Sequence, residues 1–227
     1  MANASHELRT PLTLERAILE VSLTDPDADA TTLRAACERV LAIGAQQEAL
    51  IEALLTLARS QRGLDERRSV DLTAAAADAI DAGRAAAEAK RVCIEADLAP
   101  AHTVGDQRLV ERLTANLIDN AVRHNHVGGM VTVRTGTAEG RAALSVVNTG
   151  PQIPADQLER LFQPFQRLDS SRTAHPDSLG VGLSIVAAIA AAHDAFVTAR
   201  AQEHGGLRVD VLFPVPGQYR HRGARGT

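Results

Sequence analysis

Apolar residues recur every three or four positions near the start of the chain, and this spacing predicts a helix over residues 2–23. Proline and aspartates at residues 24–29 predict a turn, after which Thr31 or Thr32 can cap a second helix that runs to about Ser60. The apolar stripe of this second helix is too wide for a two-helix hairpin to bury. We therefore expect two hairpins to pair as a four-helix bundle in a homodimer.

The pattern changes after the hairpin of residues 1–60. Residues 61–68 are polar and include a glycine, which favours a linker. From residue 69 to 216, helical spacing alternates with short β-rich runs, so we expect an α+β fold with helices on one face of a mixed sheet, an α/β sandwich. Residues 217–227 are rich in arginine and glycine and are predicted to be a disordered basic tail. The expected helices are 71–90, 106–125, 155–161 and 181–193, and the expected strands are 91–97, 102–104, 130–136, 142–148, 196–202 and 206–213.

Composition narrows this picture. The chain has 227 residues, 45% of them hydrophobic, but only four Phe, one Tyr and no Trp, so the core must consist of Ala, Leu, Val and Ile. A net charge of −4 gives no reason to expect nucleic-acid binding, which needs clustered positive charge. No apolar run is long enough to span a membrane. Cys37 and Cys93 lie in apolar contexts, which favours buried, reduced thiols over a disulfide.

The first candidate for chemistry is the run from Ser5 to Thr13. It places His6 beside Glu7, with Thr10 one helical turn later and a proline directly after it. Residues i and i+4 are neighbours on one helix face, so His6 and Thr10 point the same way. Pro11 lacks an N–H, so the helix should bend there. A single histidine on a helix is usually a solvated or core residue, but the whole string argues against that interpretation.

A second candidate is a polar stripe inside the helix predicted at 106–125. Asn116, Asn120, Arg123 and His124 are spaced i, i+4, i+7 and i+8, so they share one face. Asparagine disfavours helix interiors, and two in register require a reason. Their amide oxygens suit Mg²⁺, which keeps several waters and reaches nucleotide phosphates. The alternative is an ordinary solvated helix face.

Three further segments follow in order. Asn148 and Gly150 end a predicted strand with a tight turn where a ligand can approach the backbone. Residues 161–167, which include Arg167, precede a polar stretch at 168–178 that is long enough for a mobile lid. A glycine loop then leads into a helix, where free N–H groups and the helix dipole favour phosphate. Such a loop alone more often reflects packing, but the four pieces in this order are specific.

These segments resemble a known family over roughly residues 3–215. The first run resembles the phosphoacceptor box of bacterial sensor histidine kinases, and the later four resemble the N box, first glycine box, F box and second glycine box of their catalytic domains. The resemblance implies a dimerisation hairpin followed by an ATP-binding sandwich of the type found in gyrase, mismatch-repair and chaperone ATPases. It implies ATP-dependent autophosphorylation and transfer of the phosphoryl group to an aspartate of a response regulator receiver domain. We expect the cytoplasmic portion of a membrane-bound sensor, without nucleic acid or direct membrane contact.

The resemblance also implies a role for each matching residue. His6 would be the phosphoacceptor and Glu7 its proton acceptor. Thr10 would orient water when the phosphorylated regulator is hydrolysed, a possible second activity, or would only stabilise the turn above Pro11. The nucleotide-binding set would be Asn120 with Asn116 for Mg²⁺, Arg123 and Arg167 for the phosphates, His124 on the pocket wall, Asn148 for the adenine amino group, and the loop residues Gly150, Gly180, Gly182 and Leu183.

Three positions depart from the family pattern. Asn148 stands where aspartate is usual, Gln152 replaces a glycine, and Ser178 replaces another. The oxygen of Asn148 can still accept a hydrogen bond from adenine, without the charge that would strengthen it. These departures keep open a non-catalytic dimeric scaffold that binds nucleotide or regulator without turnover. A chaperone- or gyrase-type ATPase is a further alternative, against which the phosphoacceptor box and hairpin argue.

Overall fold

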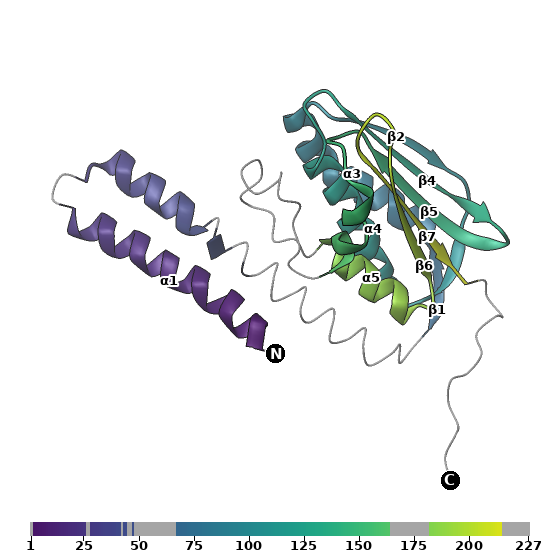
Figure 1. The fold of residues 1–227 in the computed structure, drawn as a ribbon, viewed down its shortest axis with the longest axis horizontal. Coiled ribbons are helices and arrows are strands. Elements are labelled where there is room, and N and C mark those ends of the chain that lie inside the picture. The colour runs from purple at the N-terminus through teal and green to yellow at the C-terminus, as the bar shows by residue number, and fades with distance from the viewer. Residues whose placement is uncertain are drawn as a thin grey trace, which may run out of the picture.

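The structure, a computed structural model, describes residues 2–25, 28–41, 43, 44, 47, 67–163 and 182–214, and only the backbone of residues 2–12 and 159. It comprises a helical hairpin and an α/β domain (Figure 1). The predicted end of the second helix near Ser60, the linker before Arg67, the lid at 168–178 and the tail at 217–227 lie outside the described residues. Among the helices that are described, every one is too short or too polar to cross a membrane.

The hairpin begins with α1, Ala2–Thr24, which continues through Pro11 and agrees with the predicted helix over 2–23. Residues 30–41 form the second helix, which lies antiparallel to α1 (Figure 1). Its cap is Asp29 rather than Thr31 or Thr32, because the Asp29 carboxylate accepts from Thr32 N and Oγ1, both at 2.8 Å. These hydrogen bonds from Thr32 are the main reason that the pKa of Asp29 lies below its usual value.

The α/β domain contains a five-stranded sheet in the order β2-β4-β5-β7-β6. The pair β2–β4 is parallel and the other pairs are antiparallel. A two-stranded sheet, β1–β3, lies apart. The helices α3, α4 and α5 cover one face of the large sheet (Figure 1), as the expected sandwich requires. The bounds are β1 Arg68–Asp71, α3 Leu72–Lys90, β2 Cys93–Leu98, β3 His102–Gly105, α4 Gln107–Arg123, β4 Met130–Ala138, β5 Arg141–Asn148, α5 Gly182–Ala192, β6 Phe196–Ala201 and β7 Leu207–Phe213.

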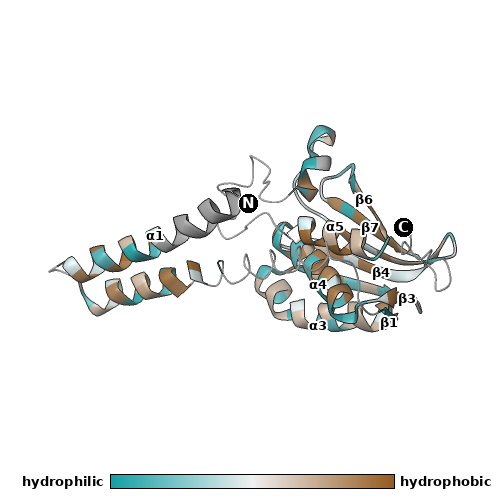
Figure 2. Cartoon of the chain, turned by 90° about the horizontal axis from the view of Figure 1, so that it is seen from below, coloured by the Kyte–Doolittle hydropathy of each residue, from teal (hydrophilic) through white to brown (hydrophobic). Residues whose placement is uncertain are grey.

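The core lies between the helices and the sheet. Alternate residues of β5 and β7 are buried, as expected for strands with one covered face. Leu144, Val211 and Phe213 are fully buried there. α5 consists almost wholly of apolar residues and shows brown shades over most of its length in Figure 2. The expected core of small and branched aliphatic residues is confirmed.

Three further expectations about local structure are wrong. Arg68 belongs to strand β1 rather than to a linker. The helix expected at 155–161 is two 3-10 turns, Ala155–Gln157 and Glu159–Phe162, which are too short to continue as an α-helix. Cys37 and Cys93 are free but exposed rather than buried. Cys93 alternates along β2 with Ile94, which packs against the core, so the thiol lies on the face of the sheet that points away from the core.

Candidate functional site

The helix α4 presents the predicted asparagine stripe beside the core. Its N-cap is Asp106, whose Oδ1 accepts from Leu109 N at 3.1 Å. Leu113, Leu117, Ile118, Ala121 and Val122 are buried, as the sequence pattern predicts. Asn116 and Asn120 are half-buried on the remaining side of the helix. The packing of the apolar side therefore determines where the two amides point.

Asn116 lies opposite the beginning of α5. Its Nδ2 donates to the carbonyl of Arg112 at 2.8 Å. A Cβ added at Gly182 would lie 4.0 Å from Asn116 Oδ1, so that oxygen faces the first residue of α5. Leu183, the next residue of α5, is buried and packs into the core. The structure thus brings Asn116, Gly182 and Leu183 together, and an amide oxygen beside a helix N-terminus fits a magnesium ion bound to phosphates.

The end of α4 carries Arg123 and His124. Arg123 Nη2 lies 3.0 Å from Asp119 Oδ2, with 41% and 59% of the two side chains exposed. Exposed pairs of this kind contribute about 1 kcal/mol or less, so Arg123 can turn to another anion at little cost. Lys90 Nζ donates to the Arg123 carbonyl, and partial burial, followed by the charge of Arg123, lowers the pKa of Lys90. His124 N–H donates to Asn120 O at 3.0 Å, which closes the helix.

Asn148 ends β5 and is almost completely buried. Its Nδ2 donates to the Thr149 carbonyl at 2.7 Å. A carbonyl can only accept, so this contact identifies the nitrogen of the amide. Oδ1 lies on the other side of the amide and is the atom that can accept from an adenine amino group. The geometry therefore allows the substitution of asparagine for the usual aspartate.

A polar cluster that sequence reasoning missed supports this loop. Thr149 Oγ1 donates to Asn125 Oδ1 at 2.7 Å and accepts from Met130 N at 2.8 Å. Asn125 Nδ2 donates to Met130 O at 2.9 Å. The cluster joins the turn after α4 to the ends of β4 and β5. Asn125 and Thr149 both lie inside recognised motifs, but their sequence distance hides the contact between them.

Two glycines of the β6–β7 turn were also missed. Gly206 has φ of +98°, and a Cβ there would lie 1.9 Å from Asn148 O. Gly206 N donates to Pro151 O at 2.9 Å. A Cβ at Gly205 would lie 2.3 Å from Gly150 O, and one at Gly150 would lie 2.7 Å from His124 O. Only glycine allows these backbones to approach so closely. The Gly-Gly pair where the second of two predicted strands begins was the available signal.

The remaining predicted site residues lie outside the side chains or residues that the structure describes. His6, Glu7 and Thr10 belong to α1, but their side chains are outside the described set. Arg167 and Gly180 fall outside the described residues altogether. Their roles remain predictions.

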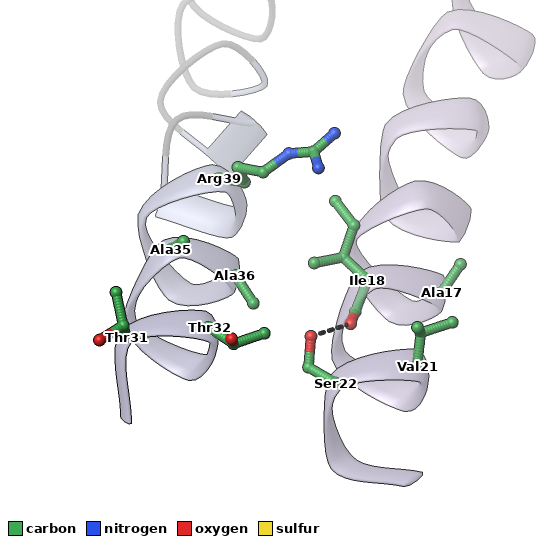
Figure 3. Close-up of a pocket in the computed structure, with 9 residues that line it drawn as sticks. All are labelled: Ala17, Ile18, Val21, Ser22, Thr31, Thr32, Ala35, Ala36 and Arg39. Atoms are coloured by element: carbon green, nitrogen blue, oxygen red, sulfur yellow. Dashed lines mark hydrogen bonds between the residues drawn. The ribbon is translucent and has the colours of Figure 1, made fainter. Parts of the chain in front are cut away.

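The hairpin contains a groove of about 610 Å³ between α1 and the second helix (Figure 3). Ser22 Oγ donates to the Ile18 carbonyl at 2.8 Å, so this polar side chain is satisfied within its own helix. Large apolar side chains also remain exposed on the hairpin, among them Val21 at 68% and Leu41 at 73%. The groove is lined by Ala17, Ile18, Val21, Ser22, Thr31, Thr32, Ala35, Ala36 and Arg39.

Comparison with known proteins defines the class. The family described as "His Kinase A (phospho-acceptor) domain" matches residues 1–63, and the family "Histidine kinase-, DNA gyrase B-, and HSP90-like ATPase" matches residues 105–217. The fold is therefore that of a phosphoacceptor hairpin followed by an ATPase-type domain. The chain belongs to the sensor histidine kinase family.

Individual relatives of the chain are also sensor proteins. Sensor protein CutS of Streptomyces coelicolor is 44% identical over 216 residues, which cover 95% of this chain and 52% of CutS. The probable sensor histidine kinase TcrY of Mycobacterium tuberculosis is 35% identical over 199 residues, 87% of this chain and 42% of TcrY. The chain thus spans about half the length of these relatives or less.

Solved structures share the fold. The histidine kinase AdeS of Acinetobacter baumannii has a TM-score of 0.71 at 23% identity, with 92% of this chain and 96% of that chain covered. Full-length ShkA, solved in complex with AMPPNP, has a TM-score of 0.67 at 22% identity over 94% of this chain and 45% of that one.

Proposed function

We propose that the chain is an ATP-dependent protein-histidine kinase that phosphorylates itself on His6 and passes the phosphoryl group to an aspartate of a response regulator. The observation that carries this proposal is the approach of Asn116 Oδ1 to Gly182, which joins the N box to the second glycine box. Asn148, at the end of the central strand, supplies an acceptor for adenine. The phosphoacceptor box lies in the same chain.

The residues divide the chemistry between two domains. Asn148 Oδ1 accepts from the adenine amino group, and the N-terminus of α5 faces the phosphates. Asn120 and Asn116 would hold Mg²⁺, which would offset the negative charge of the nucleotide phosphates. Arg123 and Arg167 would stabilise charge on the phosphates, beside His124 on the pocket wall.

The phosphoacceptor is the second half of the mechanism. His6 must be neutral at its attacking nitrogen, as an imidazole of ordinary pKa, about 6.5, mostly is at pH 7. Glu7 takes the proton from the other ring nitrogen as a general base. Thr10 would orient water if the kinase also hydrolyses the phosphorylated regulator.

Incubation of the whole chain with Mg²⁺ and γ-labelled ATP tests this function. We expect label that is lost in acid and stable in base, the behaviour of a phosphorus–nitrogen bond. Binding of nucleotide without any label would support the dimeric scaffold instead. Absence of both would contradict the proposal as a whole.

We propose that the active form is a homodimer in which two hairpins form a four-helix bundle. The exposed apolar side chains of the hairpin, such as Leu23 at 79% and Leu41 at 73%, support a buried partner surface. Light scattering coupled to gel filtration should give twice the chain mass of 24.0 kDa. A mass of one chain at micromolar concentration would contradict this proposal.

The proposed setting is the cytoplasmic part of a membrane-bound sensor, which the names and greater length of CutS and TcrY support.

Restoring aspartate, the usual residue at position 148 in the first glycine box, should improve neither the stability nor the ATP affinity of this chain. In Asn148→Asp a carboxylate oxygen would replace the nitrogen that donates to Thr149 O at 2.7 Å, so two acceptors would face each other. We expect a loss of about 1–3 kcal/mol in the free energy of unfolding, and no gain in ATP affinity. Denaturant unfolding and calorimetric titration measure the two quantities. Tighter ATP binding without loss of stability would show that the loop tolerates the carboxylate.

A further inference from the structure

His193 is a fully buried histidine that the proposed reaction does not use. It follows the last residue of α5 and has no exposed surface. Its Nε2 accepts from Asp106 N–H at 3.1 Å, and its Nδ1 lies 2.8 Å from Ile189 O. An amide N–H can only donate and a carbonyl can only accept. The proton is therefore on Nδ1, and the imidazole is neutral.

The two partners belong to the two helices of the nucleotide site. Asp106 is the N-cap of α4, which carries Asn116 and Asn120, and Ile189 lies in α5, which begins at Gly182. The imidazole therefore bonds the end of α5 to the beginning of α4. The surrounding space is closed, since a Cβ at Gly105 would lie 2.2 Å from the imidazole Cδ2.

The lengths of the two helices connect this contact to the site. From Gly182 to His193 is 193 − 182 = 11 residues, and from Asp106 to Asn116 is 116 − 106 = 10 residues. At about 1.5 Å per residue, these segments span about 16 and 15 Å. The two helices are antiparallel: His193, just after the end of α5, contacts Asp106 at the beginning of α4. Because the two segments are nearly equal in length, the beginning of α5 at Gly182 lies beside Asn116 Oδ1. A shift at the imidazole end is carried to the other end, since packed helices are stiff.

We propose that His193 is a positioning residue that holds α4 and α5 in the axial register needed by the nucleotide site. It touches no nucleotide and acts through Asn116 and the N-terminus of α5. The inference rests on the proposed function, because its readout is nucleotide affinity.

The charged groups that face the imidazole predict a pH dependence. Arg67, just before β1, is ion-paired with Asp194 at 3.0 Å, and the Asp106 carboxylate lies on the α4 side. The ring of Phe213 in β7 meets the imidazole edge-on at 6.1 Å. Burial is the main cause that lowers the pKa of His193. The hydrogen bond to Ile189 opposes this shift, the charge of Arg67 lowers the pKa further, and Asp106 raises it.

The direction of the pH dependence follows from the hydrogen bonds of the His193 imidazole. The register contact is complete above pH 6.5, the ordinary pKa of histidine, and is lost as the pH falls toward the lowered pKa of His193. Protonation would set a second N–H against Asp106 N–H. Nucleotide affinity should weaken over the same range.

Two matched variants separate the contacts. In His193→Gln, the side-chain oxygen can reach the position of Nε2 and accept from Asp106 N–H. In His193→Asn, the shorter amide can replace only Nδ1 and donate to Ile189 O. Titration of the whole chain with Mg²⁺ and AMPPNP should give a Kd near that of wild type for His193→Gln and about tenfold weaker for His193→Asn. Thermal melting is measured in parallel.

The pH arm uses the ratio of wild-type to His193→Gln Kd at each pH. Titration of the nucleotide and of the other histidines cancels in this ratio, which should be constant above pH 6.5 and rise below it. If either variant fails to fold, Gly105→Ala replaces it, because its Cβ displaces the imidazole without removing it. Gly136→Ala, with its nearest contact at 3.7 Å, is the control.

The outcomes are distinct. AMPPNP binding that differs between the Gln and Asn variants, with a pH-dependent ratio, supports the proposal. Equal affinities, a flat ratio, or affinities that merely follow melting temperature overturn it. Absence of AMPPNP binding by the wild type would instead contradict the proposed function.

Discussion

His6→Gln is expected to reduce phosphorylation of the chain to background. Glutamine keeps a polar side chain of similar reach but has no ring nitrogen that can form a bond to phosphorus. The proposed nucleotide site lies in residues 106–214, so ATP affinity should stay within about twofold of wild type. Label from γ-labelled ATP, measured after base treatment, gives the first quantity, and calorimetric titration with AMPPNP gives the second.

A second histidine provides the control. His102 is exposed on β3, in the two-stranded sheet, and the same change there should leave labelling intact. Equal label in wild type and His6→Gln would place the phosphoacceptor elsewhere. Loss of AMPPNP binding together with label would mean that the substitution disturbs the nucleotide domain, contrary to the proposed division of roles.

The sequence predicted the elements more reliably than the contacts between them. Helical and alternating patterns of apolar residues placed α1, α3, α4, α5 and six strands within a few residues, because burial on one face determines those patterns. Strand β1 was missed because four residues with one buried position, Val70, carry too little periodicity. The exposed Cys93 was misjudged because the apolar residue next to it, Ile94, faces the core, so Cys93 lies on the opposite face of the strand.

In the candidate site too, single residues could be predicted from the sequence but contacts between distant residues could not. Residues such as Asn116 and Asn148 could be proposed from the sequence because the types and order of the residues in their motifs are specific. Asn125, Gly206 and His193 were missed because each acts on a partner that is distant in sequence. Thr149 meets Asn125 across 24 residues, and His193 meets Asp106 across 87. Such pairs become visible only when the topology brings the ends of β4, β5 and the helices together.

Gly206→Ala should weaken nucleotide binding at least about tenfold and cost about 2–4 kcal/mol in the free energy of unfolding. Its Cβ would lie 1.9 Å from Asn148 O and 2.9 Å from Thr149 Cα, both backbone atoms. Relief requires the β6–β7 turn to move away from the first glycine box loop. That movement would displace Asn148, the residue proposed to bind adenine.

Gly140→Ala isolates this collision from backbone strain. Gly140 has φ of +71°, close to the +98° of Gly206, but nothing lies within 4 Å of its Cβ position. It should lose only the cost of a left-handed alanine, about 1–2 kcal/mol, and keep AMPPNP affinity. Gly150→Ala is a milder probe from the opposite side, since its Cβ would lie 2.7 Å from His124 O. Calorimetric titration, with circular dichroism to verify folding, should rank the affinities Gly140→Ala above Gly150→Ala above Gly206→Ala. Equal affinity in the Gly140 and Gly206 variants would show that the turn does not support the nucleotide loop.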